Sequence, residues 1–146
     1  MDKTVELELD HQGDRVRHHS SVVANDRIDA QTMHGFETSV RQGRGSIVRR
    51  LTQLEKEWDI DRALMVNFAI AGGVAFLIGM RRYTTSGLLS RKRKGFLYLF
   101  GAQLGFLLLH GIVGWCPPVP VFRRLGFRTS REIEGERRAL EQVLGA

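Results

Sequence analysis

Two long stretches without a charged residue constrain this chain more than any other feature. Residues 63–80 and 95–122 contain no Asp, Glu, Lys or Arg, although charged residues make up 26% of the chain. A helix rises about 1.5 Å per residue, so the first stretch covers about 27 Å, close to the ~30 Å hydrocarbon core of a bilayer. The alternative is a pair of buried core helices in a soluble protein. We expect an all-α membrane protein, in which amphipathic surface helices flank a two-helix transmembrane hairpin.

The predicted spans cover residues 62–81 and 95–116. The second is the stronger, since it is apolar almost throughout and is followed by Pro117, which cannot continue a helix. Trp58 and Trp115 flank the two spans at one face of an antiparallel hairpin, where tryptophan favours the membrane interface. We therefore expect both tryptophans to act as interface anchors.

The excess of positive charge lies between the spans. The chain has 22 Lys and Arg against 16 Asp and Glu. The predicted loop 82–94 carries a basic run that suits anionic lipid headgroups; it consists of Arg91, Lys92, Arg93 and Lys94. No aromatic residues interleave this run, so we do not expect nucleic-acid binding.

The positive-inside rule relates the orientation in the membrane to these basic residues, but two ways of counting them give opposite orientations. Counted locally, the basic loop slightly exceeds either tail, which favours a cytoplasmic loop. Pooled, the two tails hold more basic residues near the membrane than the loop does, which favours cytoplasmic tails. Both orientations stay open, and we expect both tails to be cytoplasmic.

Residues 1–40 mix charged residues with scattered aliphatic ones, and we expect them to form a mostly disordered tail. They contain no apolar segment typical of a signal peptide, and Met33 is an alternative start. The remaining residues, 41–145, form the predicted membrane hairpin domain. A single cysteine excludes an intramolecular disulfide and a cysteine-cluster zinc site, so we expect no metal and no cofactor.

Two amphipathic helices are predicted beside the spans. The first covers 46–61 and has an apolar stripe on one face, formed by Ile47, Leu51, Leu54 and Trp58. We expect it to lie on the membrane surface, and a coiled-coil seam is the alternative. The second covers 130–144 and begins with a capping box, in which Thr129 and Glu132 satisfy free backbone donors.

Polar residues within a span are the first candidates for function. Asn67 and His110 lie at similar depths near the face where Cys116 ends the second span. A neighbouring histidine lowers a thiol pKa, so this cluster could carry sulfur, sense redox state or bind a soft metal. The alternative is that Asn67 and His110 form an interhelical hydrogen bond beside an inert cysteine.

Small residues are spaced for close helix packing in both spans. They are Gly101 and Gly105 in the second span and Ala71, Ala75 and Gly79 in the first. These faces could pack against each other within the hairpin, or one could pair with a second copy of the chain. A homodimer is therefore among the expected partners, together with the bilayer and anionic lipids.

Several short motifs resemble a known family. The residues EWD at 57–59 and Arg62 precede a Gly/Ala-rich span, Gly114-Trp115-Cys116-Pro117 ends the second span, and RRLGFRT with a charged helix follows. Residues 41–145 thereby resemble the YgaP-like two-span transmembrane domain, which also occurs at the C-terminus of inner-membrane rhodaneses. The resemblance implies a bacterial inner-membrane hairpin, cytoplasmic tails and the homodimerisation of the rhodanese relatives.

The chain departs from that family in two ways. Residues 1–62 are too short for a rhodanese domain and contain no cysteine, so sulfurtransferase activity is not carried over. The basic loop is also longer than the family implies. The sequence predicts a non-enzymatic anchoring, scaffolding or dimerising module. The alternative is a thiol-dependent redox or sulfur-handling module centred on Cys116.

Overall fold

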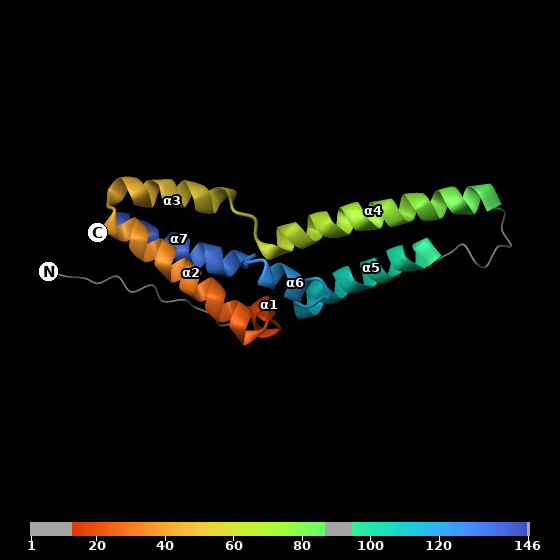
Figure 1. Cartoon of the computed structure of the whole chain (residues 1–146), viewed down its shortest axis with the longest axis horizontal. Helices are drawn as coiled ribbons and strands as arrows, with labels where there is room; N and C mark the ends of the chain where they lie inside the picture. The colour runs from red at the N-terminus through yellow and green to blue at the C-terminus, as the bar shows by residue number, and fades with distance from the viewer. Residues whose placement is uncertain (1–12, 87–94, 146) are drawn as a thin grey trace.

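The computed structural model describes residues 13–86 and 95–145, and every regular element within these ranges is a helix (Figure 1). The predicted all-α class is confirmed for this part of the chain. In chain order the helices are α1 (Arg15–His18), α2 (Val22–Arg41), α3 (Arg44–Lys56), α4 (Ile60–Ser86), α5 (Gly95–Val113), α6 (Val119–Arg124) and α7 (Ser130–Gly145).

The molecule is elongated and has two regions. Helices α4 and α5 lie side by side and form the hairpin at one end (Figure 1). The other five helices form what we call the head, in which α2, α3 and α7 pack against one another and α1 and α6 lie beside the base of the hairpin (Figure 1). The head is therefore assembled from the chain on both sides of the hairpin.

The head has a hydrophobic core between α2, α3 and α7. Its buried members are Phe36, Ile47, Leu54, Ala139 and Leu140. Leu140 is fully buried, and burying a leucine side chain contributes about 1.5–3 kcal/mol. The apolar stripe predicted for the C-terminal helix therefore packs inside the protein.

The first predicted surface helix differs from the expectation. The stripe that we placed on the membrane surface, within residues 46–61, is buried at Ile47 and Leu54 against the neighbouring helices. Helix α3 also ends at Lys56, and Glu57 has an extended backbone with φ −67° and ψ 136°. A new helix then starts at Ile60, so the surface helix and the first span are separate elements. This apolar face therefore packs against α2 and α7 rather than against lipid.

The N-terminal segment differs as well. Residues 1–12 lie outside the described residues, but the chain from Arg15 to Arg41 is largely helical rather than disordered as expected. The buried face of α2 recurs about every four residues and consists of Ala24, Ile28, Thr32, Phe36 and Ser39. Three of these five side chains are small or polar, so the helix has only a weak hydrophobic pattern.

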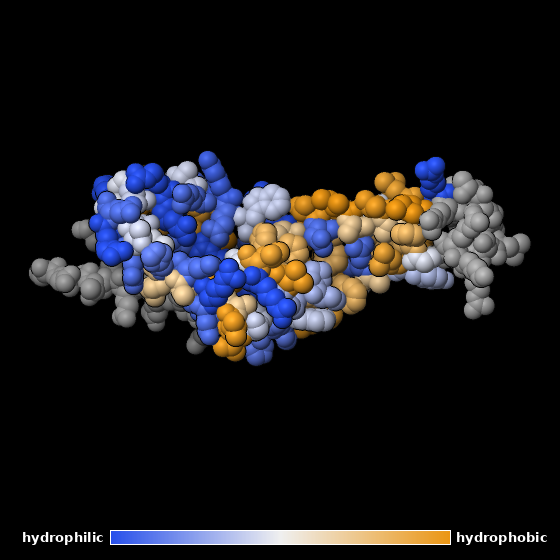
Figure 2. Space-filling view, viewed as in Figure 1, coloured by the Kyte–Doolittle hydropathy of each residue, from blue (hydrophilic) through white to orange (hydrophobic). Residues whose placement is uncertain are grey.

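Both hairpin helices are long and apolar enough to cross a membrane. None of the most apolar stretch of α5 is buried within the protein, and only a third of the corresponding stretch in α4 is. Figure 2 shows apolar side chains over the hairpin and mainly hydrophilic side chains over α2, α3 and α7. A core helix of a soluble protein would be mostly buried. These apolar stretches are mostly exposed instead, so the outer surface of the hairpin is apolar.

A second apolar cluster joins the hairpin to the head. It contains Val16 of α1, Ile60, Leu64 and Phe68 of α4, Cys116 and Val119. Gly114 follows α5 with φ +80°, and a Cβ added there would lie 2.6 Å from the Cβ of Arg15. Only glycine combines this left-handed conformation with so close an approach. The chain can therefore turn tightly from α5 into the head.

Candidate functional site

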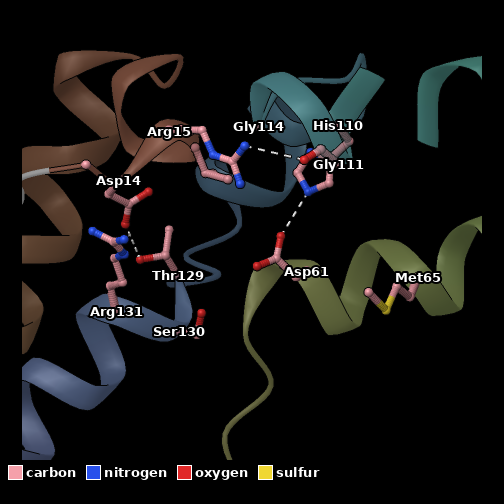
Figure 3. Close-up of a pocket in the computed structure, with 12 residues that line it drawn as sticks. Asp14, Arg15, Asp61, Met65, His110, Gly111, Gly114, Thr129, Ser130 and Arg131 are labelled. Atoms are coloured by element: carbon pink, nitrogen blue, oxygen red, sulfur yellow. Dashed lines mark hydrogen bonds and ion pairs between the residues drawn. The ribbon is translucent and has the colours of Figure 1, made fainter. Parts of the chain in front are cut away.

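A polar pocket lies where the hairpin meets the head (Figure 3). The cavity has a volume of about 380 Å³ and is lined from α1, the start of α4, the end of α5 and the start of α7. Its charged and polar residues include Asp14, Arg15, Asp61, His110, Thr129 and Arg131. We treat this pocket as the candidate site because it brings titratable side chains together at the base of the hairpin.

An aspartate and a histidine join the two hairpin helices inside this pocket. The Nε2 atom of His110 lies 2.9 Å from the Oδ1 atom of Asp61 (Figure 3). The histidine side chain is only 10% exposed, whereas that of Asp61 is 44% exposed. Asp61 lies in the first turn of α4, where the helix dipole favours a negative charge. The pair therefore ties the start of α4 to the last turn of α5.

An arginine from the head caps the C-terminal end of α5. Nη1 of Arg15 donates to the backbone oxygen of Ile112 at 2.7 Å and to that of Gly111 at 3.4 Å. The last carbonyl groups of a helix have no partner within the helix, so this contact satisfies free acceptors. Arg15 thus holds a positive charge at the end of the second predicted span.

The thiol site predicted from the sequence is arranged differently. His110 pairs with Asp61 rather than with Asn67, and no hydrogen bond among the described residues joins Asn67, His110 and Cys116. Asn67 is partly buried in α4, next to Phe68. The sequence analysis missed Asp61 because it lies just outside the uncharged stretch, where an acidic residue is ordinary.

Cys116 follows α5 and is completely buried in the apolar cluster at the junction. Burial raises the pKa of its thiol, and the nearby charge of Asp61 raises it further, although a hydrogen bond from the backbone of Val119 acts in the opposite direction. A neutral thiol is a poor nucleophile. The arrangement suits a small apolar core residue.

The small residues of the two spans do not all pack together. Ala75 and Gly79 of α4 are buried, and a Cβ added at Gly79 would lie 2.8 Å from the Leu97 side chain of α5. Ala71 is exposed. Gly101 and Gly105 have no atom within 4 Å of an added Cβ, so they do not contact α4.

A glycine that we had not singled out completes the helix contact. A Cβ added at Gly72 would lie 3.2 Å from the side-chain oxygen of Gln103 and 3.5 Å from the ring of Phe100. Gly72 lies four residues after Phe68, in the row of α4 that faces α5. The i, i+4 spacing along this row was the available signal.

The predicted interface anchors lie near the base of the hairpin. Trp58 is 45% exposed, and the guanidinium of Arg62 lies 5.1 Å from the centre of its ring. Trp115 is partly buried. The predicted headgroup-binding run, Arg91, Lys92, Arg93 and Lys94, lies outside the described residues.

Beside the pocket, the head buries a network of ion pairs around two glutamates of α7. Glu132 is held by Arg17 at 2.7 Å and by Arg123 at 2.7 Å. Burial alone would raise the pKa of Glu132, but hydrogen bonds and attraction from Arg123 outweigh it, so the pKa lies below its ordinary value. Glu132 also completes the predicted capping box, since it accepts from the backbone N–H of Thr129 at 2.8 Å.

The second glutamate, Glu136, is fully buried and binds Arg50 at 2.7 Å and Arg128. Arg128 continues the network to Glu57, which lies between α3 and α4, with a contact of 2.6 Å. The network therefore connects residues that are far apart in the sequence. Sequence reasoning missed it because charged residues are normally exposed unless they are paired.

The site has limited chemical capacity. In the described part of the chain, no group of three or more His, Cys, Asp and Glu side chains could hold a metal ion. Asp61 and His110 form a pair, and the hydroxyl residues Thr129 and Ser130 line the same pocket. No hydrogen bond among the described residues joins either hydroxyl to the pair, and the charged side chains of the pocket can bind a charged group.

Comparisons of the chain with protein-family models, characterised proteins and solved structures find no match.

Proposed function

We propose that this chain is an integral membrane protein that acts as a non-enzymatic anchoring or scaffolding module. In this proposal α4 and α5 cross the bilayer, and the head lies at one membrane face. The observation that carries the proposal is the outward apolar surface of the hairpin. Ile70 and Leu77 in α4, and Leu108 and Ile112 in α5, are 64–67% exposed. Contiguous apolar surfaces of this kind mark membrane or protein contacts.

The way in which the head is assembled supports a double crossing. Arg17, before the hairpin, binds Glu132 after it, and Arg128, after the hairpin, binds Glu57 before it. These contacts form only if both tails lie on the same side of the membrane. Two antiparallel spans satisfy this condition, whereas one span does not.

The proposal also covers the kind of membrane, the orientation, the family and self-association. We place the protein in a bacterial inner membrane with both tails cytoplasmic, and we keep the resemblance of residues 41–145 to the YgaP-like domain as a prediction. Gly101 and Gly105 present an open small-residue surface that supports pairing with a second copy. The head would then serve as a rigid platform beside the membrane.

Topology mapping tests the proposal. Single cysteines placed at Val23 in α2, at Gly135 in α7 and within the 87–94 loop would be labelled with a membrane-impermeant maleimide, in a Cys116→Ala background. We expect the protein to remain in membranes after carbonate washing, and the loop to label from the side opposite to both tails. Release by carbonate, or labelling of all three sites from one side, would refute the membrane hairpin.

The alternative, a thiol module centred on Cys116, is tested by its reactivity. Because Cys116 is buried and its pKa is raised, we expect thiol reagents to modify the native protein slowly and the unfolded protein at the rate of a free thiol. A cysteine introduced at exposed Val121 is the matched control for accessibility. Rapid native labelling of Cys116, with saturation below pH 8, would restore the thiol hypothesis.

A further inference from the structure

A groove runs along the hairpin between α4 and α5, separate from the polar pocket. Its volume is about 380 Å³, and aromatic and aliphatic side chains form most of its wall. Small residues of α4, Ala69, Gly72 and Gly73, line it as well. No atom lies within 4 Å of a Cβ added at Gly73, so the missing side chain leaves open space there.

The groove adjoins the polar pocket at its head end. Met65 lines both cavities. Along α4, Asp61, Met65 and Ala69 follow one another at intervals of four residues, so they share one face of the helix. His110 and Leu107 continue the same path along α5, three residues apart. The two cavities therefore lie end to end along the hairpin, and we call the pair the channel: it is polar at the base of the hairpin and apolar beyond it.

The length of the apolar part matches one leaflet of a membrane. From Met65 to Phe76 the groove spans twelve residues of α4, which are eleven helical steps. At about 1.5 Å per residue this is about 16 Å, and half of a ~30 Å hydrocarbon core is about 15 Å. An acyl chain of the leaflet beside the head has this length and this chemistry.

The polar part offers both signs of charge. Arg15 is exposed at the pocket wall and uses Nη1 to cap α5, which leaves guanidinium donors for a phosphate. Asp61 binds His110 through Oδ1, and its Oδ2 has no partner among the described residues. Asp14 is already used, because its two oxygens accept from the backbone of Arg17 and from the hydroxyl of Thr129.

Resting on the proposed membrane hairpin, we propose that this channel binds one phospholipid that carries a primary ammonium beside its phosphate, as phosphatidylethanolamine does. An acyl chain lies in the groove, the phosphate accepts from Arg15, and the ammonium donates to Asp61. A choline headgroup has no N–H to donate, and a glycerol headgroup has no positive charge for Asp61. The site therefore selects among headgroups on the same acyl chains.

Native mass spectrometry of the detergent-purified full chain tests this site. Phosphatidylethanolamine, phosphatidylcholine and phosphatidylglycerol, all with palmitoyl and oleoyl chains, are added together at equal concentration. We expect the ethanolamine lipid to be retained about tenfold more than either other lipid, which is the effect of one hydrogen bond to a charged group. Equal retention of the three lipids by the wild-type chain would overturn the proposed headgroup specificity.

Three variants test the two halves of the site. Asp61→Asn keeps a side chain that can pair with His110 but removes the charge, so retention of the ethanolamine lipid should fall about tenfold, to that of the other two lipids, whose retention changes little. Gly73→Leu fills the groove and should lower the retention of all three lipids. Val74→Phe is the matched control, because Val74 is exposed on the same helix, likewise gains apolar volume and lies outside the groove.

Two further results would overturn the proposal. Equal loss of lipid in Gly73→Leu and Val74→Phe would mean that lipid binds without a defined groove. An unchanged preference in Asp61→Asn would mean that the pocket does not read the ammonium. Carbonate extraction of each variant is scored separately: a chain that stays in membranes without lipid preference refutes this site alone, whereas a chain that carbonate releases refutes the membrane hairpin.

Discussion

The head and the hairpin place their apolar and charged side chains in opposite ways. In the head, apolar side chains are inside, and five charged side chains of the ionic network are buried or nearly so. In the hairpin, leucines and isoleucines point outward and the contact between the helices uses glycine and alanine. The comparison teaches that the two regions distribute apolar surface in opposite ways. The head encloses it, whereas the hairpin exposes it, as the proposed membrane crossing requires.

Specificity also has a different source in each region. The head positions its helices with paired arginines and glutamates, whose geometry is directional. The hairpin relies on the close approach of backbones at Gly72 and Gly79, where any larger side chain would meet α5. We expect changes of charge to damage the head and changes of volume to damage the hairpin contact.

The largest expected effect comes from breaking the network in the head. Arg128→Met removes the partner of Glu57 and one of the two partners of buried Glu136. Removing one member of a buried pair costs about 3–5 kcal/mol, because it leaves an uncompensated charge. Hydrogen exchange of α7 amides in detergent would report this loss, while membrane retention should not change.

The matched control is Arg137→Met. Arg137 pairs with Glu141 and Glu134 on the exposed face of α7, so exchange should stay at the wild-type level. Equal losses in the two variants would contradict the special role of the buried network.

The next effect compares one leucine in each region. Leu140→Ala empties a fully buried position in the head and should lower its free energy of unfolding by about 2–5 kcal/mol. Leu108→Ala changes a side chain that is 66% exposed on the hairpin and should change stability by about 0.5 kcal/mol or less. Unfolding of each variant in detergent measures both. A large effect at Leu108 would indicate that another protein surface covers it.

We expect acid to destabilise the head before the hairpin. Because the pKa of Glu132 is lowered in the folded head, its contribution to stability is complete above the unfolded pKa of about 4.3. It declines as the pH falls from there through the folded pKa, below which both states are protonated. Hydrogen exchange at decreasing pH should show the head losing protection first, and Glu132→Gln should flatten that dependence. The same slope in wild type and variant would assign the acid sensitivity to other carboxylates.

The smallest effect concerns the start of α7. Thr129→Ala removes the hydroxyl that accepts from the backbone of Glu132 at 3.2 Å and donates to Asp14 at 2.6 Å. Loss of such a cap costs about 0.5–2 kcal/mol. Thr52→Ala serves as the control, because its exposed hydroxyl contacts only the backbone of its own helix. Thermal unfolding followed by circular dichroism would distinguish them, and equal shifts would count against the cap.

The sequence predicted those features that depend on neighbours along the chain. The predicted spans 62–81 and 95–116 correspond to α4 and α5 within five residues at each end, and the capping box at Thr129 has both of its hydrogen bonds. Helix length, capping and apolar periodicity are local properties. One sequence is therefore enough to predict these local features.

The features that the sequence concealed depend on contacts between distant residues. The buried face of α2 includes Thr32, which binds Arg128 from 96 residues away, so its polar character made the helix resemble a solvated tail. His110 found Asp61 rather than Asn67 because the ends of the two helices face each other, and depth in a span alone does not give that register. The pairing of side chains across the hairpin is therefore visible only in the three-dimensional structure.

The order of synthesis gives the split head a further meaning. Because α1, α2 and α3 leave the ribosome before the hairpin, and α6 and α7 leave after it, Arg17 can pair with Asp29 early but meets Glu132 only when the last helix is made, and Glu57 meets Arg128 only then. In the proposed topology, completion of the head then depends on both hairpin helices crossing the membrane, since the second crossing returns the later tail to the side of the earlier one. A nascent chain that inserted only one of the two helices would keep Glu132 from Arg17 and Arg128 from Glu57, and would hold the apolar faces of α3 and α7 apart.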